Sequence, residues 1–226
     1  MKIGVFDSGV GGAAVAARLR ELLPDATVMT AHDHANVPYG SRTAAEVYRL
    51  TRRAIQPLLG AGADVIVLAC NTATAEAIDQ LRSDYPDTPF VGLEPMVKPA
   101  SRMTRSGTVL VCATPATLSS QRYHRLKGAW ARGVRIVEPD CSGWAAAVER
   151  GEAETVDLSE LVQLTVEGSA DVVVLGCTHY HWLKPRVEAA LGPDVTVLEP
   201  SDAVAAQIQR ITTAASAEQH NPAGPA

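Results

Sequence analysis

The sequence predicts an α/β protein with two pseudo-symmetric domains, each a mostly parallel sheet flanked by helices. Short apolar, β-type runs alternate with helix-like segments along the chain, which is typical of βαβ units and of buried parallel strands. Three landmarks also recur at nearly one offset: 2–12 in 107–117, 64–74 in 171–181, and 91–95 in 196–200. A repeat in this order indicates an internal duplication, and therefore two domains of one design.

In the first half of the chain, strands and helices alternate between glycine and proline stops. The helical segments have apolar residues at a period near 3.6, and the strand segments are short, apolar and rich in branched residues. Strands are expected at 2–6, 26–31, 64–69 and 88–93, and helices at 13–23, 43–59 and 73–84.

The second half restarts the pattern near residue 97. We expect strands at the repeated landmarks and at 134–138, helices near 143–150 and 157–167, and a last helix at 202–213. The repeat is complete before that last helix, so the helix is expected to return to the first domain. The predicted organisation is a first domain of 1–96 plus 202–214, a second domain of 97–201, and a small, polar, disordered tail at 215–226.

Charge and hydropathy exclude several classes of protein. The 226 residues carry a net charge of −5, which gives no support to a nucleic-acid partner. No apolar run approaches the roughly 20 residues that cross a bilayer, so no membrane association is expected. The four cysteines form no CxxC pair, which favours free thiols in the reducing cytoplasm.

Two of the cysteines, Cys70 and Cys177, occupy equivalent places in the duplication. Cysteine usually acts as a small buried hydrophobe, and Cys112 inside its apolar run fits that role. Cys70 and Cys177 instead end strands, precede polar residues and stand at predicted helix starts, where a thiolate is favoured and carboxylates bind. Ligands of parallel sheets lie beyond the carboxyl ends of the strands, so the two cysteines are expected to face one ligand across an interdomain cleft.

Paired thiols on opposite faces of one carbon suit two-base proton transfer, in which one group removes an α-proton and the other donates to the opposite face. The site must then stabilise a carbanion-like transition state. Asp7 suits the ammonium group of an amino acid, or assistance to the nearby thiol. Hydroxyl and amide groups that suit a carboxylate are those of Ser8, Asn71, Thr72, Thr114, Thr117 and Thr178.

Five segments together resemble the glutamate racemases of the aspartate/glutamate racemase superfamily: VFDSGVGG at 5–12, VPYGSR at 37–42, ACNTAT at 69–74, LEP at 93–95 and LGCTHY at 175–180. The resemblance implies an isomerase without a cofactor that converts L-glutamate to D-glutamate for peptidoglycan and so serves cell wall biogenesis and cell shape. It also implies a cytoplasmic protein that is a monomer or a homodimer.

The resemblance also implies roles for individual residues. Cys70 and Cys177 match the two acid/base groups, with Asp7 assisting the first, His179 the second, and Glu149 as a further assisting group. The substrate-contacting positions that match are Asp7, Ser8, Tyr39, Gly40, Asn71, Thr72, Thr114, Thr117, Thr178 and His179.

The chain departs from the family pattern at His181 and Trp182, which stand where proline is common, and in a short segment at 141–170. His181 and His179 with Cys177 offer metal-ligand types, but the spacing is not that of structural zinc, so no metal is expected. Three alternatives stay open: a racemase for aspartate or another amino acid, a non-catalytic amino-acid-binding or regulatory protein, and a one-base decarboxylase or isomerase, which would need only one of the two cysteines. The second cysteine argues against pure binding.

Overall fold

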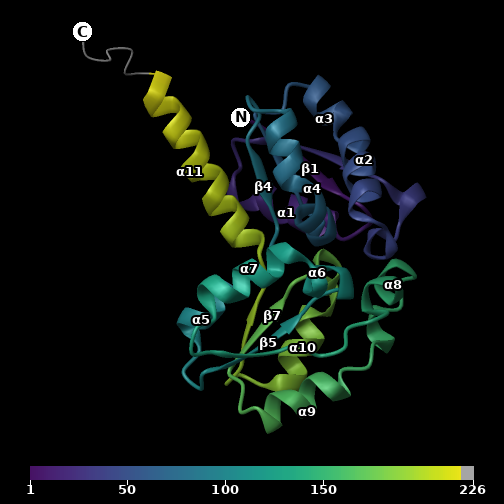
Figure 1. Cartoon of the computed structure of the whole chain (residues 1–226), viewed down its shortest axis with the longest axis vertical. Coiled ribbons are helices and arrows are strands. Elements are labelled where there is room, and N and C mark those ends of the chain that lie inside the picture. The colour runs from purple at the N-terminus through teal and green to yellow at the C-terminus, as the bar shows by residue number, and fades with distance from the viewer. Residues whose placement is uncertain (220–226) are drawn as a thin grey trace.

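The computed structural model describes residues 1–219, with the backbone alone for 212–219, and these residues form two lobes (Figure 1). Each lobe contains a four-stranded parallel sheet, and both sheets have the same strand order, β2-β1-β3-β4 and β6-β5-β7-β8. The strands are β1 (Lys2–Asp7), β2 (Thr27–His32), β3 (Val65–Leu68), β4 (Phe90–Gly92), β5 (Thr108–Cys112), β6 (Arg135–Val137), β7 (Val172–Leu175) and β8 (Thr196–Leu198).

Helices flank both sheets. In the first lobe they are α1 (Gly12–Leu22), α2 (Ala44–Ala54), α3 (Gln56–Gly60) and α4 (Asn71–Asp84). In the second lobe they are α5 (Val97–Met103), α6 (Pro115–Ser119), α7 (Gln121–Trp130), α8 (Trp144–Glu149), α9 (Ser159–Glu167) and α10 (Lys184–Leu191), and α11 (Ser201–Gln219) follows. The α/β class and the duplicated design predicted from the sequence are confirmed.

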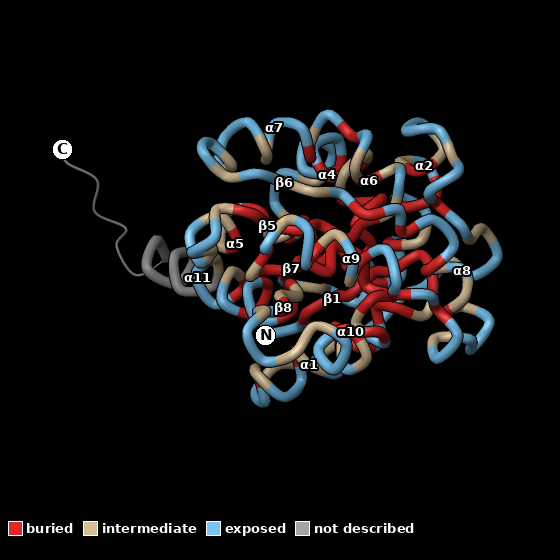
Figure 2. Tube along the Cα trace, turned by 90° about the horizontal axis from the view of Figure 1, so that it is seen from below, coloured by how far each residue is buried: buried red, intermediate tan, exposed pale blue. Residues whose placement is uncertain are grey.

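The cores lie between the sheets and these helices, and the central strands are the buried centre of the molecule (Figure 2). All four residues of β3 and all four of β7 are buried, because helices cover both faces of each sheet. One face of the first sheet packs against α1 and α11, and the other against α2, α3 and α4. The second sheet is covered by α8, α9 and α10 on one face and by α5 and α7 on the other.

Three expected elements differ in extent. The helix predicted at 43–59 is interrupted at Ile55, where the N–H of that residue reaches back to two carbonyls and α3 begins with proline at its second position. α4 begins at Asn71 instead of 73, because the sulfur of Cys70 accepts a hydrogen bond from the N–H of Ala73 and caps the helix. The predicted loop before residue 43 contains two short 3-10 turns, at 34–36 and 39–41.

The last helix, α11, packs on the first lobe, along which it runs in Figure 1. Val204, Ala205 and Ile208 are buried in the core that α1 shares with the first sheet, and Arg18 of α1 forms an ion pair with Asp202 at 2.8 Å. The helix continues to Gln219, and so includes residues 215–219 of the segment predicted to be a disordered tail. Residues 220–226 of that predicted tail lie outside the described residues.

No helix within the described residues is both long and apolar enough to cross a membrane.

Candidate active site

Cys70 and Cys177 reach one cavity of about 480 Å³ from different lobes. Cys70 lies two residues after the end of β3, and Cys177 lies two residues after the end of β7, so each thiol lies at the carboxyl end of the third strand of its repeat. Parallel topology places each thiol at the carboxyl edge of its own sheet, and both edges contribute to this one cavity. The structure thus brings the two predicted cysteines to one site.

Most of the predicted site residues line this cavity with the cysteines. Tyr39 and Gly40 come from the second 3-10 turn, and Glu149 is the last residue of α8. The predicted residues in the cavity wall are Ser8, Tyr39, Gly40, Cys70, Asn71, Thr72, Thr114, Glu149, Cys177, Thr178 and His179.

Asp7 and Thr117 do not line the cavity, and each contacts a residue that does. The carboxylate of Asp7 accepts hydrogen bonds from the N–H groups of Gly9 and Gly12 and from the hydroxyl of Thr178, at 3.4 Å. The Thr117 hydroxyl is 3.0 Å from that of Thr114, and both hydroxyls are held at the start of α6. These two residues therefore support the wall of the site instead of forming it.

The Cys70 thiol is buried and hydrogen-bonded at the start of α4. Its sulfur accepts from the Ser8 hydroxyl at 3.2 Å and from the N–H of Ala73 at 3.4 Å. Burial and the negative charge of Asp7 raise the pKa of this thiol to about 11, although the two hydrogen bonds oppose the rise. Burial therefore outweighs the helix N-terminus, which was expected to favour a thiolate at Cys70.

The Cys177 thiol belongs to a different local structure. It precedes a 3-10 turn, Thr178–Leu183, and not the α-helix predicted there, so it lacks a long helix dipole behind it. Burial raises the pKa of Cys177 even though backbone N–H groups stabilise its thiolate. Both thiols are accordingly protonated at neutral pH before a ligand binds.

His179 links Cys177 to a carboxylate. Its Nδ1 is 3.6 Å from the sulfur of Cys177, and its Nε2 is 2.5 Å from Oε1 of Glu149. The same Glu149 oxygen accepts from the N–H of Val10 at 3.0 Å. Burial tends to raise the pKa of Glu149, but the hydrogen bonds from His179 and Val10 lower it below its usual range. An ionised Glu149 holds the proton on Nε2 and leaves Nδ1 free to accept the proton of Cys177.

The glycine-rich turn after β1 explains how the first lobe approaches this histidine so closely. A Cβ added to Gly11 would lie 2.6 Å from the Thr178 hydroxyl and 2.9 Å from the His179 nitrogen of the main chain. A Cβ on Gly9 would overlap the Glu149 carboxylate. The turn therefore needs glycine because it passes between the two lobes at the site, and not because it binds a phosphate.

Sequence reasoning missed several residues in the cavity wall. Arg150 follows the predicted Glu149, and Ser41 lies in the predicted VPYGSR motif, so proximity to a motif was the available signal for both. Val37 and Pro38 lie in the same motif and Pro115 follows Thr114, whereas Ala145 and Ala146 had no such signal. The missed residues are Val37, Pro38, Ser41, Pro115, Gly143, Ala145, Ala146 and Arg150.

Comparison with known proteins decides the family. A family model described as "Asp/Glu/Hydantoin racemase" matches residues 12–208. The chain belongs to this family. A glutamate racemase of Roseiflexus is 41% identical over 213 residues, which is 92% of this chain and 78% of the relative.

Solved structures of racemases have the same fold as this family member. An Escherichia coli glutamate racemase, solved with L-glutamate and the activator UDP-MurNAc-Ala, is 30% identical with a TM-score of 0.78, over 92% of this chain and 80% of that one. A Francisella tularensis glutamate racemase with D-glutamate is 25% identical with a TM-score of 0.80, over 95% of this chain and 82% of that one. Among the described residues, no group of three or more His, Cys, Asp or Glu side chains is arranged to hold a metal ion.

Proposed function

We propose that the chain interconverts L-glutamate and D-glutamate by two-base proton transfer between Cys70 and Cys177. The observation that carries the proposal is the shared cavity, which receives one thiol from the end of β3 and the other from the end of β7. Family membership and the relatives named as glutamate racemases support this substrate. Solved relatives with L- and D-glutamate support it further.

In the proposed reaction one cysteine acts as a thiolate and the other as a thiol. The thiolate takes the proton from Cα, the electron pair stays on the substrate carbon, and the opposite thiol gives its proton to the other face. The configuration inverts and the two cysteines exchange protonation states, so the reverse direction uses the same groups with exchanged roles.

Because burial raises the pKa of both thiols, one must lose its proton when the substrate binds. On the Cys177 side, Nδ1 of His179 is placed to accept it, with Glu149 stabilising the imidazolium that results. We propose that Asp7 assists Cys70. Its carboxylate is fully buried, and burial raises its pKa although the charge of His179 acts to lower it.

The remaining polar groups of the wall are assigned to the substrate. We propose that Asn71, Thr72, Thr114 and Thr178, which line the cavity, bind the substrate's carboxylates. We assign Ser8, together with Tyr39 and Gly40 from the facing turn, to the rest of the ligand, and Thr117 to the orientation of Thr114. The wider role we propose is supply of D-glutamate for peptidoglycan in the cytoplasm, by a monomer or a homodimer.

Circular dichroism of L-glutamate and D-glutamate with the purified protein tests the reaction. We expect loss of optical activity from either enantiomer without an added cofactor, and none from aspartate at the same concentration. An unchanged signal from both glutamate enantiomers contradicts the proposal. If aspartate alone loses optical activity, the substrate is aspartate and not glutamate.

Exchange of the α-proton in deuterated water tests the two-base assignment. Cys70→Ala and Cys177→Ala should each abolish racemisation, and each should retain exchange from one enantiomer only, the opposite one in the two variants. Cys112→Ala is the matched control, because Cys112 is buried in the second core and does not line the cavity. Exchange that disappears equally for both enantiomers in both variants argues against separate bases.

A further inference from the structure

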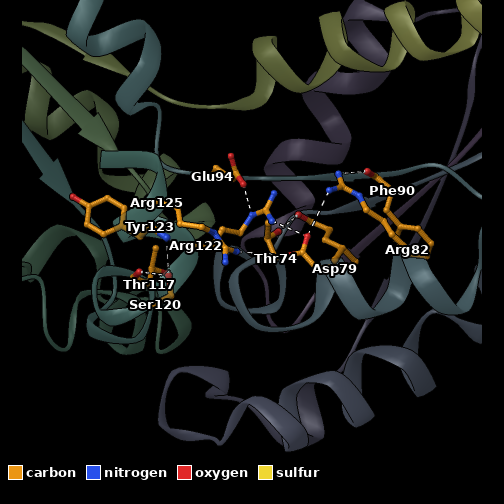
Figure 3. A network of polar contacts seen from close by, with 11 residues as sticks. Thr74, Asp79, Arg82, Phe90, Glu94, Thr117, Ser120, Arg122, Tyr123 and Arg125 are labelled. Carbon is orange, nitrogen blue, oxygen red and sulfur yellow. Dashed lines mark hydrogen bonds and ion pairs between the residues drawn. The ribbon is translucent and has the colours of Figure 1, made fainter. Parts of the chain in front are cut away.

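A cluster of charged side chains joins the two lobes close to the proposed site (Figure 3). Arg122 of α7 is its centre: Nε donates to Glu94, and Nη1 donates to Oδ1 of Asp79 at 2.9 Å. Asp79 lies on α4, and Glu94 lies in the connection that leaves β4 for the second lobe. One guanidinium thus holds three segments that are far apart in the sequence.

Two of these segments, α4 and α7, are connected to walls of the cavity. α4 begins at Asn71, next to Cys70, and Asp79 follows two turns later on the same rigid helix. α7 begins after Ser120, whose hydroxyl donates to the carbonyl of Thr117 at 2.7 Å and accepts from the N–H of Tyr123 at 3.1 Å. A shift of α7 is therefore passed to Thr117.

Thr117 then passes such a shift to the cavity wall, because its hydroxyl lies 3.0 Å from that of Thr114. Residues of the charged cluster and of both walls also surround one small cavity of about 10 Å³. They are Asn71, Glu94, Thr117 and Arg122. The charged cluster and the two walls are thus neighbours in one packed region.

The position of Arg122 distinguishes it from the other arginines of the cluster. Its side chain is 21% exposed, whereas that of Arg125, one turn along α7, is 64% exposed. Arg125 reaches Asp79 at 3.5 Å, and Arg82 reaches it at 3.8 Å from within α4 itself. Only Arg122, among the described residues of this cluster, pairs with both Asp79 and Glu94.

We propose that Arg122 is a positioning residue that fixes the spacing between two walls of the cavity, the one formed by Asn71 and Thr72 of α4 and the one formed by Thr114 and Pro115 at the start of α6. The inference rests on the proposed function, because it assigns glutamate contacts to both walls. A planar guanidinium that pairs with two carboxylates in different directions sets both a distance and an angle, which a lysine does not.

This role makes a specific kinetic prediction. Without Arg122 the two walls sample wider separations, and the substrate must restore the spacing when it binds, so the cost appears in KM. Once the substrate is bound, both thiols are near their usual places and kcat changes little. A residue that only supports folding behaves differently, because its loss lowers the amount of active enzyme and therefore kcat, with KM unchanged.

The test compares Arg122→Gln with Arg125→Gln, which removes a charge from the same helix and the same Asp79. We expect Arg122→Gln to raise KM for both enantiomers about tenfold, equivalent to about 1.4 kcal/mol, with kcat within about threefold. Arg122→Lys should lie between the wild type and Arg122→Gln. Arg125→Gln should change KM by less than about twofold. An unchanged KM in Arg122→Gln, or an equal effect in Arg125→Gln, overturns the proposal.

Glu94→Gln tests the same positioning role from the other side of the ion pair, and its KM decides the question if Arg122→Gln does not fold. It keeps the Arg122–Asp79 pair, and it should raise KM in the wild-type background but add little to Arg122→Gln, because both changes break one interaction. An unchanged KM in Glu94→Gln, or full additivity, contradicts the proposal.

The wild-type protein separates the two hypotheses. If it does not turn over glutamate, the proposed function fails, and hydrogen exchange of the α4 and α7 amides then tests the positioning role without a substrate. Arg122→Gln should speed exchange in both helices relative to Arg125→Gln. Equal exchange in the two variants overturns the positioning role.

Discussion

At the scale of single residues, Asn71 has an environment that a ligand would complete. Its side chain is buried, yet neither its amide nitrogen nor its amide oxygen has a hydrogen-bond partner among the described residues. Buried polar groups are normally paired, and an unpaired one costs about 1–3 kcal/mol. Asn71 also lines the cavity, so a ligand that pairs with its amide would remove this cost, as expected for a preorganised binding group.

Replacement of Asn71 by leucine should therefore separate stability from activity. We expect Asn71→Leu to unfold at equal or higher urea concentration than the wild type, and to raise KM for glutamate at least about tenfold. Ser101→Ala is the control, because the Ser101 hydroxyl is also buried without a described partner but lies on α5 and does not line the cavity. Loss of stability in Asn71→Leu with an unchanged KM would show that Asn71 serves the fold.

The Cys70 thiol makes stability depend on pH. Its pKa is raised to about 11 in the folded protein, against about 8.5 for an unfolded thiol. The folded state therefore holds this proton more tightly, and the contribution to stability is present below about pH 8.5 and lost as the pH rises through 11. At about 1.4 kcal/mol per unit, the loss amounts to about 3 kcal/mol.

Urea unfolding of the wild type and of Cys70→Ser at pH 7, 9 and 10 measures this effect. The free energy of unfolding should fall more steeply with pH in the wild type, because serine does not titrate and still caps α4. Parallel pH dependence in the two proteins would mean that the thiol of Cys70 does not titrate as its burial requires.

At the scale of elements, the turn between β1 and α1 shows why short motifs carry so much of the site. The chain has no side chain at Gly9, Gly11 and Gly12, and this lets it pass between Asp7 of the first lobe and Thr178 of the second. The same glycines expose main-chain N–H groups, two of which hold the Asp7 carboxylate. A motif that resembles a phosphate loop is thus a close contact between the two lobes.

Gly11→Ala should test this contact. The new methyl group would lie 2.9 Å from the main-chain nitrogen of His179, which cannot move like a flexible side chain, so the turn or the histidine must shift. Because small misplacements of acid/base groups cost large factors in rate, we expect kcat/KM to fall at least about tenfold. Gly60→Ala, where an added Cβ meets nothing within 4 Å, should leave kcat/KM unchanged. Equal behaviour of the two variants would remove the turn from the site.

At the scale of the whole molecule, α11 determines how the domains are composed. The helix begins after β8 in the second lobe but buries Val204, Ala205 and Ile208 in the first. We propose that it completes a discontinuous first domain of 1–96 and 202–214. The chain therefore crosses between the two lobes twice, once between β4 and α5 and once between β8 and α11.

Removal of part of the α11 contact should destabilise the first domain. Ile208 is fully buried, and truncation of such a side chain to alanine costs about 2–5 kcal/mol through lost burial and the cavity left behind. We expect Ile208→Ala to lower the free energy of unfolding by that amount, and the exposed Arg210→Ala to change it by less than about 0.5 kcal/mol. Urea unfolding measures both, and similar small values would show that α11 contributes little to the first core.

The sequence by itself determined the fold class, the duplication and most members of the cavity wall. These are local properties: period 2 and period 3.6 patterns, glycine turns, and polar residues that follow buried strands. Parallel strands bring their carboxyl ends to one edge of a sheet, which predicted that Cys70 and Asn71 lie at a site, and the duplication predicted that Cys177 faces them from the second sheet.

Only the tertiary structure decided what depends on contacts between distant segments. It decided the raised pKa of the Cys70 thiol, because burial outweighs the helix start there, and it placed Asp7 and Thr117 in support of the wall. It also joined Glu149 to His179 and Arg122 to Asp79 and Glu94. Charge pairing and desolvation depend on distances across the fold, and residues that are 28 to 43 positions apart leave no periodic pattern in the chain.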